Sequence, residues 1–166
     1  RLLARETNIS DLIQFCTERD PGVWEEFVGF TPDIVGREER PYGKRPAGPG
    51  IADIVLRRDE NLAVVEVKLG HTMDDDQQLA YEEGSDAAIL VLAALENDRS
   101  RVTEQMSPRW RFVSLSTLFS IWASSPDNTV RAIAREIVTV LKGWEDLLKG
   151  VFRPSGDPGA VPLSAI

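Results

Sequence analysis

The chain has 166 residues, of which 42% are hydrophobic and 28% charged, and its formal net charge is −8. This length and apolar share are typical of one globular domain with a sizeable core. The negative charge excludes a protein that coats nucleic acid nonspecifically, because such proteins are basic. The single cysteine, Cys16, excludes an internal disulfide and indicates a cytoplasmic protein. The longest apolar run, 87–95, is too short to cross a bilayer, so no membrane association is expected.

The first forty residues predict helices followed by a strand. Apolar residues recur at helical spacing over residues 12–28, and Asp20-Pro21 marks a break between two helices. Asn8 and Ser10 are alternative caps, which places Glu6 either in the first helix or just before it. Residues 33–39 are expected to form a first strand. The segment 41–50, rich in proline and glycine, is then predicted to be a loop. Its Lys44 and Arg45 are candidate phosphate contacts, or ordinary solvated surface charges.

Two β-branched apolar runs, Ile51–Leu56 and Leu62–Leu69, flank the turn residues Arg58–Asn61 and predict an antiparallel hairpin. Asp53 interrupts the first run, and Glu66 and Lys68 interrupt the second. Charges in buried strands cost several kcal/mol unless they are paired or bind a metal, so they indicate a functional site.

Residues two apart in a strand project from the same face, about 7 Å apart, so Glu66 and Lys68 point together. Pairing of the two strands would bring Asp53 beside Glu66. Two carboxylates and an ammonium group form an arrangement that can hold a divalent cation and direct a water molecule at a phosphate. The alternative interpretation is a partly buried cluster of ion pairs.

A helix is predicted after this hairpin, because the acidic run Asp74–Asp76 suits a helix N-terminus. On that helix, Gln77 and Tyr81 are four residues apart and share one face. If the helix begins one residue later, Gln78 takes the place of Gln77.

The second half of the chain predicts two more strands and two helices. Residues 87–93 form a continuous apolar strand, and 111–114 a last strand before a helix from Ser116. The intervening segment 97–111 is expected to be a polar connection, and its Arg99 and Arg101 indicate a phosphate-facing edge.

Asn128 is predicted to cap a long amphipathic helix, whose apolar stripe indicates either core packing or the face of a homodimer. Residues 152–166 are predicted to form a flexible C-terminal tail after a single domain, 1–151. The order of elements predicts an α/β fold with a mixed central sheet flanked by helices.

Asp53, Glu66-Val67-Lys68 and Gln77-x-x-x-Tyr81 together resemble the PD-(D/E)XK nuclease superfamily, particularly members with a Gln-x-x-x-Tyr motif after the catalytic strand. The opening segment around Glu6 is similar to one branch of that superfamily, so the resemblance covers roughly residues 1–95. One departure is Ala52, which stands where a proline usually precedes the aspartate.

The resemblance implies a restriction-endonuclease-like αβββαβ core with extra C-terminal helices. It implies that Asp53, Glu66 and the carbonyl oxygen of Val67 bind Mg²⁺ or Mn²⁺, with Glu6 completing the metal shell. Lys68 would orient or deprotonate the attacking water, and Gln77 and Tyr81 would position the site and the DNA backbone. The expected function is a metal-dependent nuclease that hydrolyses DNA phosphodiester bonds in genome defence, restriction or repair. The alternative is a catalytically inactive module of this fold that binds nucleic acid or protein within a larger system.

Overall fold

The computed structural model describes residues 6–39, 51–70, 73, 75–84 and 88–151. These residues build a five-stranded mixed sheet with its strands side by side in chain order. The strands are β1 (Ile34–Glu39), β2 (Ala52–Arg58), β3 (Asn61–Lys68), β4 (Ile89–Ala94) and β5 (Trp110–Ser114). Neighbours among β1, β2 and β3 are antiparallel, whereas β3, β4 and β5 run parallel.

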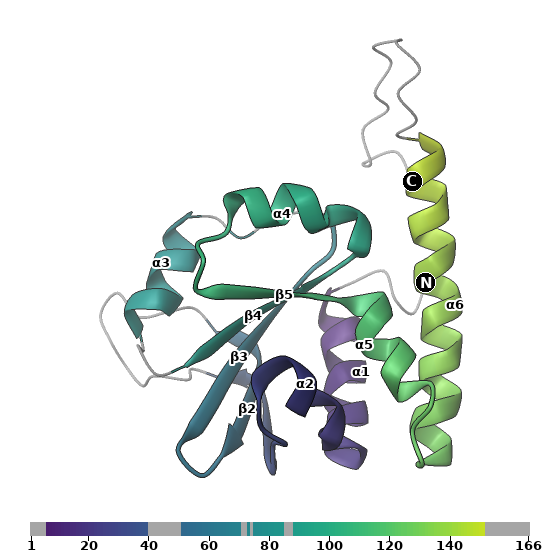
Figure 1. Cartoon of the computed structure of the whole chain (residues 1–166), viewed down its shortest axis with the longest axis horizontal. Helices are drawn as coiled ribbons and strands as arrows, with labels where there is room; N and C mark the ends of the chain where they lie inside the picture. The colour runs from purple at the N-terminus through teal and green to yellow at the C-terminus, as the bar shows by residue number, and fades with distance from the viewer. Residues whose placement is uncertain (1–5, 40–50, 71–72, 74, 85–87, 152–166) are drawn as a thin grey trace.

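Helices cover both faces of this sheet (Figure 1), which confirms the predicted α/β class. One face carries α1 (Glu6–Arg19), the 3₁₀ turn η1 (Pro21–Trp24), α2 (Glu25–Val28), α5 (Leu115–Trp122) and α6 (Asn128–Val151). The other face carries α3 (Asp75–Gly84) and α4 (Arg99–Gln105), which follows the 3₁₀ turn η2 (Glu96–Asp98).

Alternating side chains of the central strands supply both cores. Ile54 and Leu56 of β2 pack under α1 and α5, and Val55 between them packs on the α3 side. The same alternation on β3 places Val65 in the first core and Val64 in the second. Both strands are therefore buried on two sides, which explains why their sequences are nearly continuous apolar runs.

The predicted antiparallel hairpin is confirmed, with a tighter turn than expected. Arg58 pairs with Asn61, which leaves Asp59 and Glu60 as a two-residue turn. Asp59 adopts a φ of 51°. Aspartate tolerates this left-handed conformation better than most residues, so the turn needs no glycine.

The segment 97–111, expected to be a polar connection, contains part of η2, all of α4 and the start of β5, which the sequence pattern does not resolve. A helix of seven residues in which Val102 is the buried residue shows no apolar period that a sequence could reveal. The cap of α6 also differs by one residue. The carboxylate of Asp127 accepts hydrogen bonds from the backbone N–H groups of Thr129 and Val130, at 2.9 and 3.0 Å.

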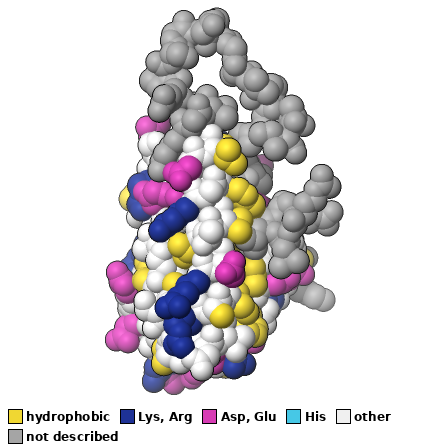
Figure 2. All heavy atoms as spheres, turned by 90° about the vertical axis from the view of Figure 1, so that its right-hand side faces the viewer, with side chains coloured by type: hydrophobic (Ala, Val, Ile, Leu, Met, Phe, Trp, Pro, Cys, Tyr) yellow, Lys and Arg dark blue, Asp and Glu magenta, His cyan; other side chains and the backbone are white. Residues whose placement is uncertain are grey.

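The apolar stripe of α6 packs mainly into the core, through Val130, Ala134, Ile137 and Leu141. On the same helix, Val140 and Leu147 are 38% and 68% exposed. Figure 2 shows a column of hydrophobic side chains on this side of the molecule. Pairing of two copies through α6 stays a prediction, and the tail 152–166 lies outside the described residues. None of the described helices has the length and apolar character needed to span a membrane.

A buried hydrogen bond joins α1 to η1 inside the first core, where Trp24 Nε1 donates to Thr17 Oγ1 at 2.8 Å. Thr17→Val keeps the shape of the side chain but leaves this indole N–H without its acceptor. We expect the free energy of unfolding to fall by about 1–3 kcal/mol. Urea denaturation followed by tryptophan fluorescence measures the loss. The matched control is Thr139→Val, which removes an exposed hydroxyl bonded to the carbonyl of Arg135, and an equal loss in both variants would contradict this account.

Candidate active site

Asp53 lies near the start of β2, and Glu66 and Lys68 lie near the end of β3, on the sheet face covered by α3. Val55, two residues after Asp53, and Val64, two residues before Glu66, belong to the core that includes Tyr81 of α3. Because side chains two apart share a face, Glu66 and Lys68 project toward the same helix. Asp53 lies close enough for its charge to help raise the pKa of Tyr81. The structure therefore brings together the residues whose charges interrupt the two apolar runs.

Glu66 is a carboxylate inside the sheet, with only 3% of the residue exposed. Its Oε1 accepts hydrogen bonds from Lys68 Nζ at 2.9 Å and from Gln77 Nε2 at 2.7 Å. Its Oε2 accepts from the hydroxyl of Tyr81 at 3.3 Å. Three donors thus compensate a charge that would otherwise be strongly destabilising at this depth.

Asp53 is half-buried, and its Oδ2 accepts a hydrogen bond from the backbone N–H of Val67 at 2.8 Å. Burial first, and then the negative charge of Glu66, raise the pKa of Asp53 to about 6, although the Val67 N–H and Lys68 oppose this. Asp53 and Glu66 therefore lie close enough for the charge of Glu66 to add to the effect of burial on the pKa of Asp53.

Glu6 reaches the same end of β3 from the opposite face of the sheet. It is the first described residue of α1, and its Oε1 accepts a hydrogen bond from the backbone N–H of Leu69 at 2.8 Å. Its charge contributes to the raised pKa values of Asp53 and Lys68. The structure thus brings Glu6 close enough to influence both groups electrostatically.

Lys68 is the cation of the cluster. Burial alone would lower the pKa of its ammonium group, but the charge and hydrogen bond of Glu66, together with Glu6 and Asp53, raise the pKa above its ordinary value. Lys68 is therefore protonated at neutral pH. This state suits an electrostatic or orienting role and argues against removal of a proton from water by Lys68 in the protein as it stands.

The structure decides between the two glutamines of α3. Gln77 is the one that reaches Glu66, whereas Gln78 donates to the carbonyl of Gln105 at 3.2 Å. Tyr81, one turn after Gln77, packs edge-on against Trp110 with the ring centroids 5.8 Å apart. Gln77 and Tyr81 therefore act as a pair that fixes the Glu66 carboxylate, one on each oxygen.

Two of the four predicted nucleic-acid contacts, Arg99 and Arg101, are described, and both form ion pairs within the segment 96–101. Arg99 pairs with Glu96 at 2.5 Å and lies over the ring of Phe112, and Arg101 pairs with Asp98 at 2.7 Å. Both arginines are therefore engaged in local ion pairs on the surface. Lys44 and Arg45 lie outside the described residues, so contact of all four with a phosphate backbone stays a prediction.

Arg37 of β1 is a charged residue near the cluster that the sequence did not single out. Its guanidinium group donates to the backbone carbonyl oxygen of Asp53 and to the carboxylate of Asp11 in α1. An arginine within the predicted strand 33–39 is the same kind of signal that singled out Asp53, namely a charge inside a strand.

The donor chemistry of the cluster fits a hard divalent cation, because carboxylate and carbonyl oxygens are its preferred ligands. Burial and the charge of Glu66 raise the pKa of Asp53, and a cation would offset the repulsion between the two carboxylates. The described residues nevertheless include no ready-made group of three or more His, Cys, Asp or Glu side chains around a metal position. Glu66 holds Lys68 instead, so cation binding would require Glu66 to exchange a donor.

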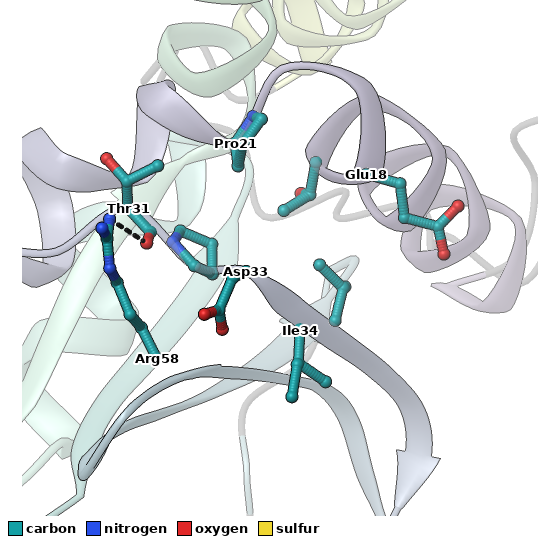
Figure 3. A pocket seen from close by; sticks show the side chains of 9 residues that line it. Glu18, Pro21, Thr31, Asp33, Ile34 and Arg58 are labelled. Carbon is teal, nitrogen blue, oxygen red and sulfur yellow. Dashed lines mark hydrogen bonds between the residues drawn. The ribbon is translucent and has the colours of Figure 1, made fainter.

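A groove of about 560 Å³ lies at the other end of β2 (Figure 3). Its lining includes Asp33, Ile34 and Arg58, and Arg58 donates to the carbonyl of Thr31 at 3.1 Å. Asp53 is five residues from Arg58, so the groove and the carboxylates are separated by about 17 Å of extended strand. The groove is therefore separate from the charged cluster.

Comparisons with protein-family models, with curated proteins and with solved structures returned no match for this chain.

The raised pKa of Asp53, about 6 instead of 3.8, predicts how stability depends on pH. Between these values the folded protein holds a proton on Asp53 that the unfolded chain releases, so stability is lost as the pH rises through this window. Asp53→Asn removes the charge and keeps an oxygen for the Val67 N–H. In chelator at about pH 8 we expect this variant to be more stable than the wild type by about 1–3 kcal/mol, with the gain vanishing below about pH 4.

Urea denaturation at the two pH values measures this difference. The control Asp33→Asn changes an exposed carboxylate at the far end of the sheet and should not alter stability in this pH-dependent way. A variant Asp53→Asn that is less stable than the wild type at about pH 8 would show that Asp53 is a favourable ion-pair partner instead.

Proposed function

We propose that this chain is a metal-dependent nuclease of the PD-(D/E)XK type that hydrolyses phosphodiester bonds of DNA. The observation that carries the proposal is the convergence of Asp53, Glu66 and Lys68 on one face of two adjacent strands. Lys68 Nζ lies 2.9 Å from Glu66 Oε1, and burial together with the charge of Glu66 raises the pKa of Asp53. Perturbed acids beside a cation are frequent at active sites.

The arrangement of elements also supports the proposal. Helix α1, strands β1 to β3, helix α3 and strand β4 follow the αβββαβ order of the restriction-endonuclease-like core. The acids lie on the second and third strands of that order, and the glutamine and tyrosine lie on the helix that follows. A likeness in the order of elements is an analogy, so the side chains carry more of the argument than the topology does.

Asp53, Glu66 and the carbonyl oxygen of Val67 would hold Mg²⁺ or Mn²⁺, and Glu6 would add a carboxylate through α1. Such an ion supplies a water-derived nucleophile near neutral pH and draws charge from the phosphate oxygens.

The protein side chains would orient the reacting groups and balance their charge. Lys68, protonated beside Glu66, would offset the negative charge that develops on the phosphate. Gln77 and Tyr81 hold the two oxygens of Glu66 and thereby fix its direction. A ligand held within a few tenths of an ångström is what efficient phosphoryl transfer requires.

The second candidate is an inactive module of the same fold that binds nucleic acid or protein. Two observations favour it: the donors of Lys68, Gln77 and Tyr81 already compensate Glu66, and the net charge is −8. In that case the cluster would be a buried ion-pair network that stabilises the sheet. Cation binding separates the two candidates.

A nuclease of this type should cut supercoiled and linear DNA in the presence of Mg²⁺ or Mn²⁺, and EDTA should abolish the cleavage. Lys68→Gln removes the cation at the phosphate, and we expect the rate to fall about 10²–10⁴-fold. Agarose gels of plasmid and end-labelled duplex follow the reaction, with RNA of the same sequence as a parallel substrate. Lys142→Gln, an exposed lysine of α6, is the control and should keep full activity. Unchanged cleavage by Lys68→Gln would refute the role of this lysine.

Isothermal titration calorimetry with Mn²⁺ tests the site without DNA. We expect the wild type to bind and both Asp53→Asn and Glu66→Gln to lose binding at least 10-fold, because each removes one charged oxygen ligand. Asp33→Asn is the control for a lost surface charge. Absence of binding in the wild type, or binding that both variants retain, would favour the inactive module.

A further inference from the structure

Arg37 links three elements around the cluster. It lies on β1, and only 11% of its side chain is exposed. One terminal nitrogen donates to the backbone carbonyl oxygen of Asp53. The other terminal nitrogen and Nε donate to the same oxygen of Asp11 in α1, at 2.8 and 3.2 Å. The guanidinium group therefore joins β2 to α1 across β1.

The sheet is interrupted at the residue that Arg37 holds. The β1–β2 ladder pairs Arg37 with Ile54 and Glu39 with Ala52, without a pair at Asp53 between them. Glu38, which would face Asp53, has a φ of 50°, a left-handed conformation that is costly for a glutamate. On the other side of β2, toward β3, the ladder begins at Ile54 and Val65, so Asp53 has no paired residue there either.

Side chains replace the missing ladder bonds at Asp53. Its carbonyl oxygen accepts the Arg37 guanidinium, and the N–H of Val67 binds the Asp53 carboxylate instead of a backbone oxygen. A ladder normally fixes the direction of each strand side chain. At Asp53 this constraint is weaker, so the arginine restrains the backbone from which the carboxylate projects.

The second acceptor of Arg37 extends its effect to Glu6. Asp11 and Glu6 lie on the same helix, α1, which packs against β1, β2 and β3. Glu6 bonds the N–H of Leu69 at the end of β3. An arginine that holds both Asp11 and Asp53 therefore sets the distance between the helix that carries one acid and the strand that carries another.

We propose that Arg37 is a positioning residue of the nuclease site, which holds Asp53 and the Glu6 helix in the geometry that binds the cation. This inference rests on the proposed function. Arg37 does not contact the phosphate in this account, because three of its five N–H donors already bind protein oxygens and the side chain is nearly buried. Mutation of a residue that hydrogen-bonds to a metal-ligating residue commonly lowers metal affinity 10- to 100-fold.

Arg37→Gln tests the inference, because a glutamine cannot span both acceptors. The matched control is Arg58→Gln, which removes another arginine bound to a backbone carbonyl, at the opposite end of β2. For Arg37→Gln we expect Mn²⁺ affinity by calorimetry to fall about 10-fold or more. We also expect kcat to fall by a similar factor with KM for DNA unchanged, and faster hydrogen exchange at the amides of Val67 and Leu69. Arg58→Gln should change none of these readouts.

A second variant tests the inference even if Arg37→Gln does not fold. Asp11→Asn alters an exposed side chain and weakens only the α1 half of the link, so we expect a smaller loss of Mn²⁺ affinity in the same direction. Mn²⁺ affinity and kcat equal to those of Arg58→Gln would overturn the inference while leaving the nuclease proposal intact. A raised KM with unchanged kcat would also overturn it, because Arg37 would then contact DNA. A wild type that neither binds Mn²⁺ nor cuts DNA would remove the proposed function and this inference together.

Discussion

The carboxylate of Glu66, buried in a central strand, is the constraint on which the rest of the cluster depends. A buried charge requires hydrogen-bond donors to compensate it. Lys68 on the same strand and Gln77 and Tyr81 on α3 donate to this carboxylate. The same requirement fixes how α3 packs on the sheet, since the edge-on contact of Tyr81 with Trp110 continues the network into β5. A hydrophobic residue at this position would pack more simply, so the charge is retained at a cost that a function would explain.

The sequence reveals much of this arrangement, because charges stand out in apolar strands. Asp53, Glu66 and Lys68 interrupt two β-branched runs, and the turn between the runs sets the pairing that brings them together. The α/β class follows from the order of periodic segments and is what the structure has. The metal, DNA and the catalytic roles come from the resemblance to PD-(D/E)XK nucleases, and they stay predictions.

The remaining features depend on tertiary contacts that no local pattern encodes. Gln77 and Gln78 both suit the start of a helix, and only the packing of α3 against Glu66 separates them. Helix α4 is short and mostly exposed, so its sequence lacks an apolar period. Arg37 is a charge inside a predicted strand, but only the break in the ladder at Asp53 shows what its guanidinium group holds. Long-range contacts and backbone irregularities are invisible to periodicity, and they concentrate around functional sites.

The most direct test of the account is a crystal structure of the protein soaked in Mn²⁺, with anomalous diffraction to locate the ion. The account predicts an anomalous peak between the carboxylates of Asp53 and Glu66, next to the carbonyl oxygen of Val67, with Lys68 Nζ drawn away from Glu66 Oε1. A map without a peak there, in which Lys68 still lies about 2.9 Å from Glu66, would contradict it. The cluster would then be an ion-pair network that holds α3 on the sheet.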